Sequence, residues 1–256
     1  MSRGKESRIR WGVVVSVVVA CAAAGVVWSV AGKADPSNTA GHCGDTAAAK
    51  FGWGTPRRFA DFNDPAELSN WWLYDGRGHA GNGRRTPGAI SVSDGLLTIT
   101  GDGQGTSGGM GLKGPGQIHG RWEVCAKSST VTDTYHSVLL AWPDAEDWPA
   151  GGEIDFMEIA DPKRQTVEFN LHYGADDRKT SGSVQIDATQ WHSWAVEWTP
   201  DRITAYVDGV KWWETTDSAT FPPRPMHLCM QLDNFGGDTR GGGQQNVDWA
   251  REYSYP

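Results

Sequence analysis

Three carboxylates lie within six positions of a mostly apolar segment that runs from Gly151 to Ile159. In a β-strand the side chains alternate between the two faces, so Glu153 and Asp155 share one face. Glu158 is an odd number of residues from both, and a regular strand would place it on the opposite face. A β-bulge inserts one extra residue and returns Glu158 to the side of the other acids. The sequence therefore predicts a bulged strand with three acids on one face.

The same spacing directs the apolar residues of this segment. We expect Ile154, Ile159 and either Phe156 or Met157 to face the core. Alternating acidic and apolar residues are also typical of a half-solvated strand whose acids have no function. Three acids on one face repel one another, however, and a merely solvated strand has no reason to include such repulsion.

Two tryptophans that precede the acids indicate what the acids act on. Trp142 and Trp148 could form a surface for a pyranose ring, because the apolar C–H face of a sugar packs against an aromatic ring. One carboxylic acid and one carboxylate beside such a surface are the groups that glycosidic-bond hydrolysis requires. The segment therefore points to a glycoside hydrolase.

The elements that must position these residues are predicted to be short strands. Asp94-Gly95 and Asp208-Gly209 form turns typical of hairpins. Many short strands with regular turns predict an all-β fold, a sandwich of antiparallel sheets. The expected strands are 89–93, 96–100, 120–127, 138–142, 153–159, 166–173, 191–198, 202–207, 210–213, 226–232 and 247–253.

The N-terminus has the composition of a targeting segment. Residues 1–10 contain four Lys or Arg side chains, and residues 11–31 form a nearly unbroken apolar run of 21 residues. Such a pattern is typical of a secretory signal, but the run is also long enough to span a bilayer. We therefore expect 1–34 to be a signal peptide or an N-terminal membrane anchor, and the protein to be secreted or extracellular. Residues 35–55 are small and polar, which predicts a flexible linker before one domain at 56–256.

The charge of the domain limits its partners. Residues 1–34 carry five basic side chains and one acidic side chain, so the net charge of −8 for the chain leaves −12 on residues 35–256. Nucleic acid is a poor partner for this domain because phosphates require basic surfaces. A neutral substrate fits, although Arg84, Arg85 and Arg121 could line a cleft. We expect a monomer that meets a membrane only through its N-terminal segment.

Three cysteines follow the leader, namely Cys43, Cys125 and Cys229. An odd number permits one disulfide and one free thiol in an oxidising compartment. Cys125 and Cys229 both lie in expected strands and could pair if those strands are neighbours. Buried free thiols are the alternative.

The segment from Glu153 to Glu158 resembles the catalytic strand of glycoside hydrolase family 16, which includes laminarinases and lichenases, in its bulged E-x-D-x-x-E form. The resemblance extends in family order over about residues 58–256, and includes the segments 120–123, 197–200, 206–209 and 247–249. It implies a jelly-roll β-sandwich with a concave substrate cleft. It also implies retaining hydrolysis of internal β-glycosidic bonds, and we expect a β-1,3- or β-1,3-1,4-glucan as the substrate and no required cofactor.

The resemblance further implies roles for individual residues. Glu153 matches the nucleophile, Glu158 the general acid/base, and Asp155 an assisting residue. An ionised Glu153 is expected to keep Glu158 protonated, because neighbouring carboxylates resist ionising together. Asp248 matches a ligand of a structural calcium, and pairing with Arg251 is the alternative for its carboxylate. The expected substrate-binding residues are Trp148, Trp142, Asn82, Tyr135, His136, Asn170, His172, Gln231 and Asp233.

Two cleft segments depart from the family pattern. Residues 135–137 are Tyr-His-Ser where many members have a Trp-Pro pair, and residues 231–237 match only partly. These departures leave the glycan open but not the chemistry. Two other functions fit the sequence: a transglycosylase that remodels a surface glycan, favoured if residues 11–31 are a retained anchor, and a catalytically inactive carbohydrate-binding jelly roll, which would not need the acids.

Overall fold

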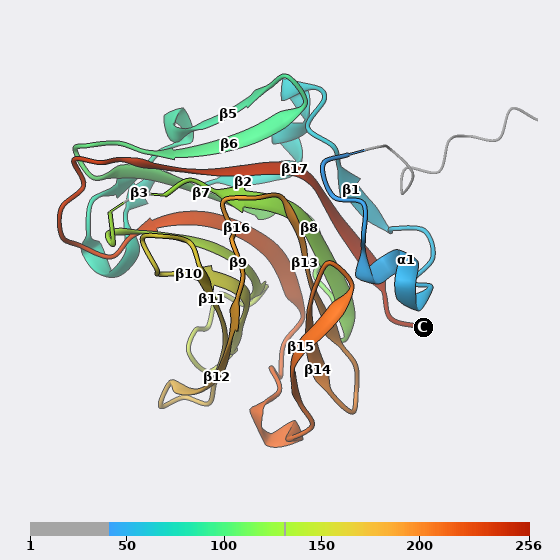
Figure 1. Ribbon diagram of the computed structural model, residues 1–256. Coiled ribbons are helices and arrows are strands. Elements are labelled where there is room, and N and C mark those ends of the chain that lie inside the picture. Colours follow the sequence, from blue (N-terminus) through green and yellow to red (C-terminus); the bar gives the residue numbers. More distant parts are fainter. Residues whose placement is uncertain (1–40, 131) are drawn as a thin grey trace, which may run out of the picture. The chain divides into compact units, whose positions relative to one another are not determined.

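Two β-sheets form the part of the protein that the computed structural model describes, which is residues 41–130 and 132–256 (Figure 1). The predicted signal or anchor segment, and residues 35–40 of the predicted linker, lie outside these residues. Within them, no helix is long and apolar enough to cross a membrane. The two-sheet arrangement confirms the all-β sandwich expected from the sequence.

The first sheet has eight strands in the order β15-β14-β13-β8-β17-β6-β5, with β1 beside β17. All of its neighbouring strands are antiparallel. Its strands are β1 (Arg58–Ala60), β5 (Ile90–Ser93), β6 (Leu96–Gly101), β8 (Gly120–Ser128), β13 (His192–Trp198), β14 (Ile203–Val207), β15 (Val210–Thr215) and β17 (Gly243–Ser254).

The second sheet has nine strands in the order β12-β11-β10-β9-β16-β7-β4-β3, with β2 beside β7. Its strands are β2 (Trp71–Leu73), β3 (Gly76–Arg77), β4 (Arg84–Arg85), β7 (Thr106–Leu112), β9 (Tyr135–Pro143), β10 (Glu153–Ile159), β11 (Thr166–Tyr173), β12 (Arg178–Gln185) and β16 (Met226–Asn234). The helices are α1 (Ala47–Phe51) and the 3-10 turns η2 (Pro65–Asn70), η3 (His79–Gly81), η4 (Pro87–Ala89) and η5 (Ser218–Thr220). The predicted acidic strand, β10, therefore lies inside this sheet, between β9 and β11.

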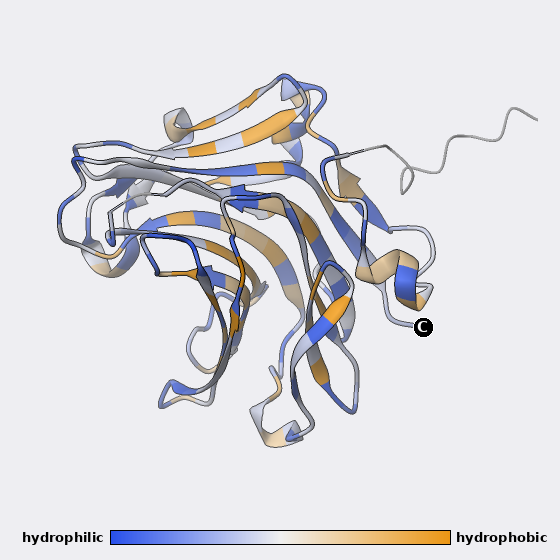
Figure 2. Ribbon diagram, in the orientation of Figure 1, coloured by the Kyte–Doolittle hydropathy of each residue, from blue (hydrophilic) through white to orange (hydrophobic). Residues whose placement is uncertain are grey.

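One large hydrophobic core contains side chains from both sheets. Trp122 and Val196 of the first sheet belong to the same buried cluster as Phe156 and Met230 of the second. Hydrophobic and hydrophilic residues are mixed along the strands (Figure 2), as expected where one face of a strand packs and the other does not. Each fully buried Leu, Ile or Phe contributes about 1.5–3 kcal/mol to folding. The acids of β10 are thus attached to a well-packed scaffold.

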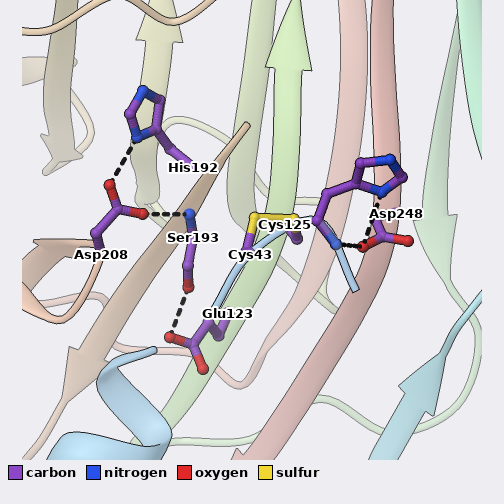
Figure 3. Close-up of a disulfide and its surroundings, with 8 residues drawn as sticks. Cys43, Glu123, Cys125, His192, Ser193, Asp208 and Asp248 are labelled. Carbon is purple, nitrogen blue, oxygen red and sulfur yellow. Dashed lines mark hydrogen bonds and ion pairs between the residues drawn. A yellow bond between two sulfur atoms is a disulfide. The ribbon is translucent and has the colours of Figure 1, made fainter. Parts of the chain in front are cut away.

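Residues 41–55 are ordered against the first sheet, which corrects the prediction of a flexible linker for this stretch. Ala47, Ala48 and Trp53 are buried in a cluster with Tyr206 and Tyr253. The first backbone amides of α1 donate to the buried carboxylate of Glu123 in β8, and Ala47 N lies 2.6 Å from Glu123 Oε1. Glu123 is shown in Figure 3. A short alanine-rich segment gains stability only from such tertiary contacts, and these are invisible in its local composition.

The cysteines form the expected one disulfide and one free thiol. Cys43 is bonded to Cys125 of β8 (Figure 3), and Cys229 is free and buried. The alternative pairing of Cys125 with Cys229 is wrong, because Cys125 is bonded to Cys43 and the strands β8 and β16 are not neighbours. The disulfide joins the N-terminal segment to the first sheet.

Candidate active site

A β-bulge brings the three acids together, as the spacing predicts. Asp155 is opposite Asn170 on β11, whereas Glu158 is opposite Glu168, so three steps on β10 match two on β11. The register to β9 shifts between Asp155 and Met157. One extra residue in β10 is therefore present just before Glu158.

The bulge also settles which apolar residues face the core. Ile154 and Ile159 are fully buried, as expected. Phe156 and Met157 are both buried, at 0% and 1% exposure, where the sequence left the choice between them open. The two bulge residues thus share the core side, and the acids are left on the other side of β10.

Glu158 is held at both carboxylate oxygens. Asn170 Nδ2 donates to Oε2 at 2.5 Å, and His136 Nδ1 lies 3.2 Å from Oε1. Ser181 Oγ donates to Asn170 Oδ1 at 2.6 Å, which directs the amide group of Asn170 toward Glu158. Asn170 and His136, both expected to bind substrate, therefore lie in the site as partners of the expected acid/base.

Asp155 and Glu153 form a second group with His172. Asp155 is 3% exposed, and its Oδ2 lies 3.6 Å from His172 Nε2. His172 Nδ1 lies 2.7 Å from Asp177 Oδ1, which fixes the orientation of the imidazole ring. Glu153 is opposite His172 in the register of the two strands. His172 thus belongs to the catalytic face, next to the buried aspartate.

The protonation of the three acids differs from the expectation. Burial raises the pKa of Glu153 to about 7, and the negative charges of Glu158 and Asp233 add to the increase. Burial and the charges of Glu153 and Glu158 raise the pKa of Asp155 well above its usual range. For Glu158, burial acts upward, but the hydrogen bond and charge of His136 and the hydrogen bond from Asn170 outweigh it and lower the pKa. In the free protein the protons therefore favour Glu153 and Asp155 over Glu158.

A cleft of about 680 Å³ lies beside Glu153. Trp148, an expected sugar platform, is 41% exposed, and its ring is nearly parallel to that of Trp142, at 10° and 6.5 Å between centroids. The cleft is lined by Trp72, Tyr74, Gly78, His79, Ala80, Arg85, Trp142, Glu146, Trp148, Glu153, His227, Gln231 and Asp233. Four of the expected binding residues, Trp142, Trp148, Gln231 and Asp233, are therefore brought together.

Tyr135 is not in the cleft, which corrects its prediction as a binding residue. It is fully buried in the core, and its hydroxyl donates to the carbonyl of Asp102 at 2.6 Å. Neighbouring residues of a strand face opposite sides, so Tyr135 and His136 could not both face a substrate. Asn82 lies near Gly236 and does not line the cleft.

Several cleft residues were not predicted from the sequence. Trp72 is 49% exposed and packs edge-on against His227. Arg85, noted only as a cationic exception, donates to Asp233 Oδ1 at 2.6 Å. The other two noted arginines lie elsewhere: Arg84 pairs with Asp75, and Arg121 with Glu197 of the first sheet. Trp72 and Arg85 come from strands of two or three residues, where no periodicity marks a face. His227 lies on the longer strand β16, and alternation places it on the same face as Gln231 and Asp233.

The residues at Asp248 do not by themselves resemble a calcium site. Its Oδ2 accepts the backbone N–H of His42 at 2.6 Å (Figure 3), and the Arg251 guanidinium lies over the Trp249 ring. Calcium binds about six to eight oxygens. Among the described residues, the one group of three acidic, His or Cys side chains close enough to hold a metal ion is Glu153, Asp155 and His172. The structural calcium therefore stays a prediction.

Comparison with known proteins extends these observations. Residues 83–251 match the family model for glycosyl hydrolases family 16. The beta-glucanase of Rhodothermus marinus is 28% identical over 151 residues, which are 51% of each chain. The glucan endo-1,3-beta-glucosidase A1 of Niallia circulans is 27% identical over 165 residues, 53% of this chain and 24% of that protein. The chain thus spans about half or less of these relatives.

The fold has solved counterparts. The laminarinase structure from Rhodothermus marinus aligns with a TM-score of 0.71 at 22% identity, and the alignment covers 78% of this chain and 97% of that one. That likeness shows the jelly-roll fold expected from the sequence. Together with the family match over most of the domain, it leads to one conclusion: the chain belongs to glycosyl hydrolases family 16.

Proposed function

We propose that this protein is an exported, retaining endo-β-glycanase that hydrolyses internal bonds of a β-glucan. The observation that carries the proposal is the bulged strand β10, which places Glu153, Asp155 and Glu158 on one face beside an aromatic cleft. The names of the two relatives, a beta-glucanase and a glucan endo-1,3-beta-glucosidase, support a β-glucan as the substrate class.

The three acids take separate roles in this proposal. Glu153 attacks the anomeric carbon and displaces the glycosidic oxygen, forming a covalent glycosyl-enzyme. Glu158 protonates that oxygen and then takes a proton from the water that releases the sugar. The raised pKa of Asp155, caused by burial and by its two acidic neighbours, favours its protonated form, which can donate a hydrogen bond to Glu153. We therefore propose that Asp155, the expected assisting residue, supports the nucleophile Glu153.

The cleft suits a neutral glycan. Trp142 and Trp148 supply aromatic faces for stacking, and Gln231 and Asp233 supply polar groups for sugar hydroxyls. Arg85, a cation in the cleft, is paired with Asp233, so its charge is balanced within the protein. An anionic polymer would meet a domain with a net charge of −12 over residues 35–256.

Two features support export. Residues 1–34 have the pattern of a signal peptide or anchor, and the disulfide between Cys43 and Cys125 is of a kind that persists in oxidising compartments. N-terminal sequencing of the mature protein distinguishes a cleaved signal from a retained anchor. Size-exclusion chromatography tests the monomeric state that we propose.

Incubation of the purified full chain with neutral β-glucans, agars, carrageenans and galactans, read by oligosaccharide mass, tests the substrate class. We expect β-1,3- or mixed-linked glucan to be cut to oligosaccharides of several lengths. Cleavage of carrageenan alone would contradict the proposal. Added acceptor oligosaccharide separates hydrolysis from transglycosylation, because a transglycosylase would produce lengthened acceptors.

A further inference from the structure

An aromatic stack fixes His136 beside the expected acid/base. The His136 ring is stacked on Phe235, at 3.7 Å between centroids and 12° between planes. His79 is also stacked on Phe235, at 4.1 Å and 16°. Two rings cannot occupy one face of a phenyl ring at such distances, so Phe235 lies between the two imidazoles. The stack limits rotation of the His136 ring and keeps its Nδ1 directed at Glu158.

The two oxygens of Glu158 have different partners. Oε2 accepts from Asn170, whose own carbonyl is occupied by the hydroxyl of Ser181. Oε1 is the oxygen within 3.2 Å of His136 Nδ1. Because an amide N–H can only donate, Oε2 must stay an acceptor, and Oε1 is the oxygen that can share a proton with the imidazole.

The other charged groups near His136 leave Glu158 as its main partner. Asp233 is directly opposite His136 in the register of β9 and β16, but it pairs with Arg85 at 2.6 Å and with His79 at 3.9 Å. Lys179 of β12 adds positive charge near Glu158 and near Asp155. Asp155 in turn interacts with Glu153. Glu168 of β11 is opposite Glu158 in the register. Glu158 is the carboxylate that lies within hydrogen-bond distance of His136.

We propose that His136 is a positioning residue that stores the proton which Glu158 delivers to the departing sugar. The proposal rests on the proposed function and assigns this residue a role in it. With the proton on Nδ1 the pair is imidazolium and carboxylate; with the proton on Oε1 it is neutral imidazole and carboxylic acid. Moving one proton between the two atoms converts Glu158 into the acid that the first step requires.

The proton count closes over one catalytic cycle. In the first step the bond from the anomeric carbon to the leaving oxygen breaks, Glu153 bonds to that carbon, and the stored proton passes through Oε1 to the leaving oxygen. In the second step water attacks the anomeric carbon, and its proton passes to Oε1 and on to Nδ1, while Glu153 is released as a carboxylate. The relay is needed because the pKa of Glu158 is lowered in the free protein, whereas those of Glu153 and Asp155 are raised, so Glu158 does not hold the proton by itself.

The first test measures the proton directly and needs no turnover. NMR titration of the His136 ring is compared between the intact wild-type chain and the Glu158→Gln variant, which keeps an oxygen acceptor but no charge. The imidazole midpoint should fall by about 1 pH unit or more in the variant, since a carboxylate within hydrogen-bond distance favours imidazolium. An unchanged midpoint would overturn the proposal.

The second test separates proton storage from hydrogen bonding. His136→Asn keeps an N–H donor close to the position of Nδ1, and His136→Phe keeps the stack on Phe235. Both should lower kcat on the glucan by about 10-fold or more, with KM within about 2-fold, and should spare an aryl glycoside whose leaving group needs no proton. Full kcat on the glucan in His136→Asn would show that a donor suffices, and would overturn the proposal.

A histidine on the first sheet, His192, provides a matched control. His192→Asn removes another histidine–carboxylate pair, that of His192 with Asp208 at 2.6 Å (Figure 3), and should leave the ratio of glucan to aryl-glycoside rates unchanged. A change of that ratio in the control would count against a special role of His136. If the wild type cleaves no glycoside at all, the proposed function fails, and the NMR titration alone decides the role of His136.

Discussion

The chemistry of this site depends on how three neighbouring carboxyl groups divide their protons. Glu153 is partly buried among negative charges, Asp155 is buried, and Glu158 is held by His136 and Asn170. A nucleophile must be ionised, so the raised pKa of Glu153 sets the lowest pH at which the first step proceeds.

The acid side of the pH profile follows from this. The pKa of Glu153 is raised to about 7 by burial and then by the charges of Glu158 and Asp233, so the carboxylate is present above that pH and is lost below it. We expect kcat/KM on the glucan to fall as the pH drops through about 7, because kcat/KM reports the groups of the free enzyme. A pH–rate profile checks this, and full activity retained at about pH 5 would contradict it.

At the residue scale the sequence predicted the bulge that brings the three acids to one face, but it predicted the residues that line the cleft only in part. The acids were found because period-two alternation with one extra residue constrains Glu153, Asp155 and Glu158 together. The same alternation excludes Tyr135, since His136 next to it faces the site. The contact of His136 with Glu158, and the pairing of Arg85 with Asp233, join residues of different strands and depend on the register, which single segments do not contain.

At the element scale, the N-terminal segment and β8 are coupled by one buried acid. Glu123 Oε1 accepts from Ala47 N at 2.6 Å and from Ser193 Oγ at 2.8 Å. Burial raises the pKa of Glu123 to about 7, although these hydrogen bonds act in the opposite direction. The folded protein therefore holds this proton more tightly than the unfolded chain does. The composition of residues 41–55 predicted a linker because the contacts that order this segment, with Glu123 and Tyr206, come from distant parts of the sequence.

This coupling predicts a pH dependence of stability. Between about pH 4.5 and 7 the folded state binds more protons at Glu123 than the unfolded state, so this group lowers the free energy of unfolding as the pH rises, by up to about 3 kcal/mol. Glu123→Gln mimics the protonated acid and should remove that part of the decrease. Denaturant unfolding of both proteins at pH 5 and pH 8 measures it, and equal pH dependence would disprove the assignment.

At the scale of the whole molecule, the disulfide and the candidate catalytic acids lie on different sheets. The acids and the cleft belong largely to the nine-stranded sheet, whereas the disulfide joins residues 43 and 125 at the eight-stranded sheet. The two-sheet fold was predictable because many short alternating strands joined by tight turns can bury their apolar faces in few ways other than a sandwich. The order of strands within each sheet was not, since it depends on contacts distant in the sequence.

This division predicts the effect of losing the disulfide. Cys43→Ser releases a link between residues 82 positions apart, and should lower the free energy of unfolding by about 2–4 kcal/mol. Activity on the glucan at 25 °C should stay unchanged, because the cleft lies on the other sheet. Unfolding curves and initial rates on the same preparation check both parts. Lost activity with unchanged stability would show that the N-terminal segment takes part in the site.

The central claim is that Glu153 is the nucleophile and Glu158 the acid/base of a retaining reaction. Azide rescue of Glu158→Ala tests it most directly, with an activated aryl β-glucoside and with the anomeric configuration of the product determined by NMR. The variant should still form the glycosyl-enzyme on Glu153, and azide should accelerate turnover and yield the β-glycosyl azide, while Glu153→Ala with azide should give the α-azide. An α-configured product from Glu158→Ala would contradict this assignment of roles.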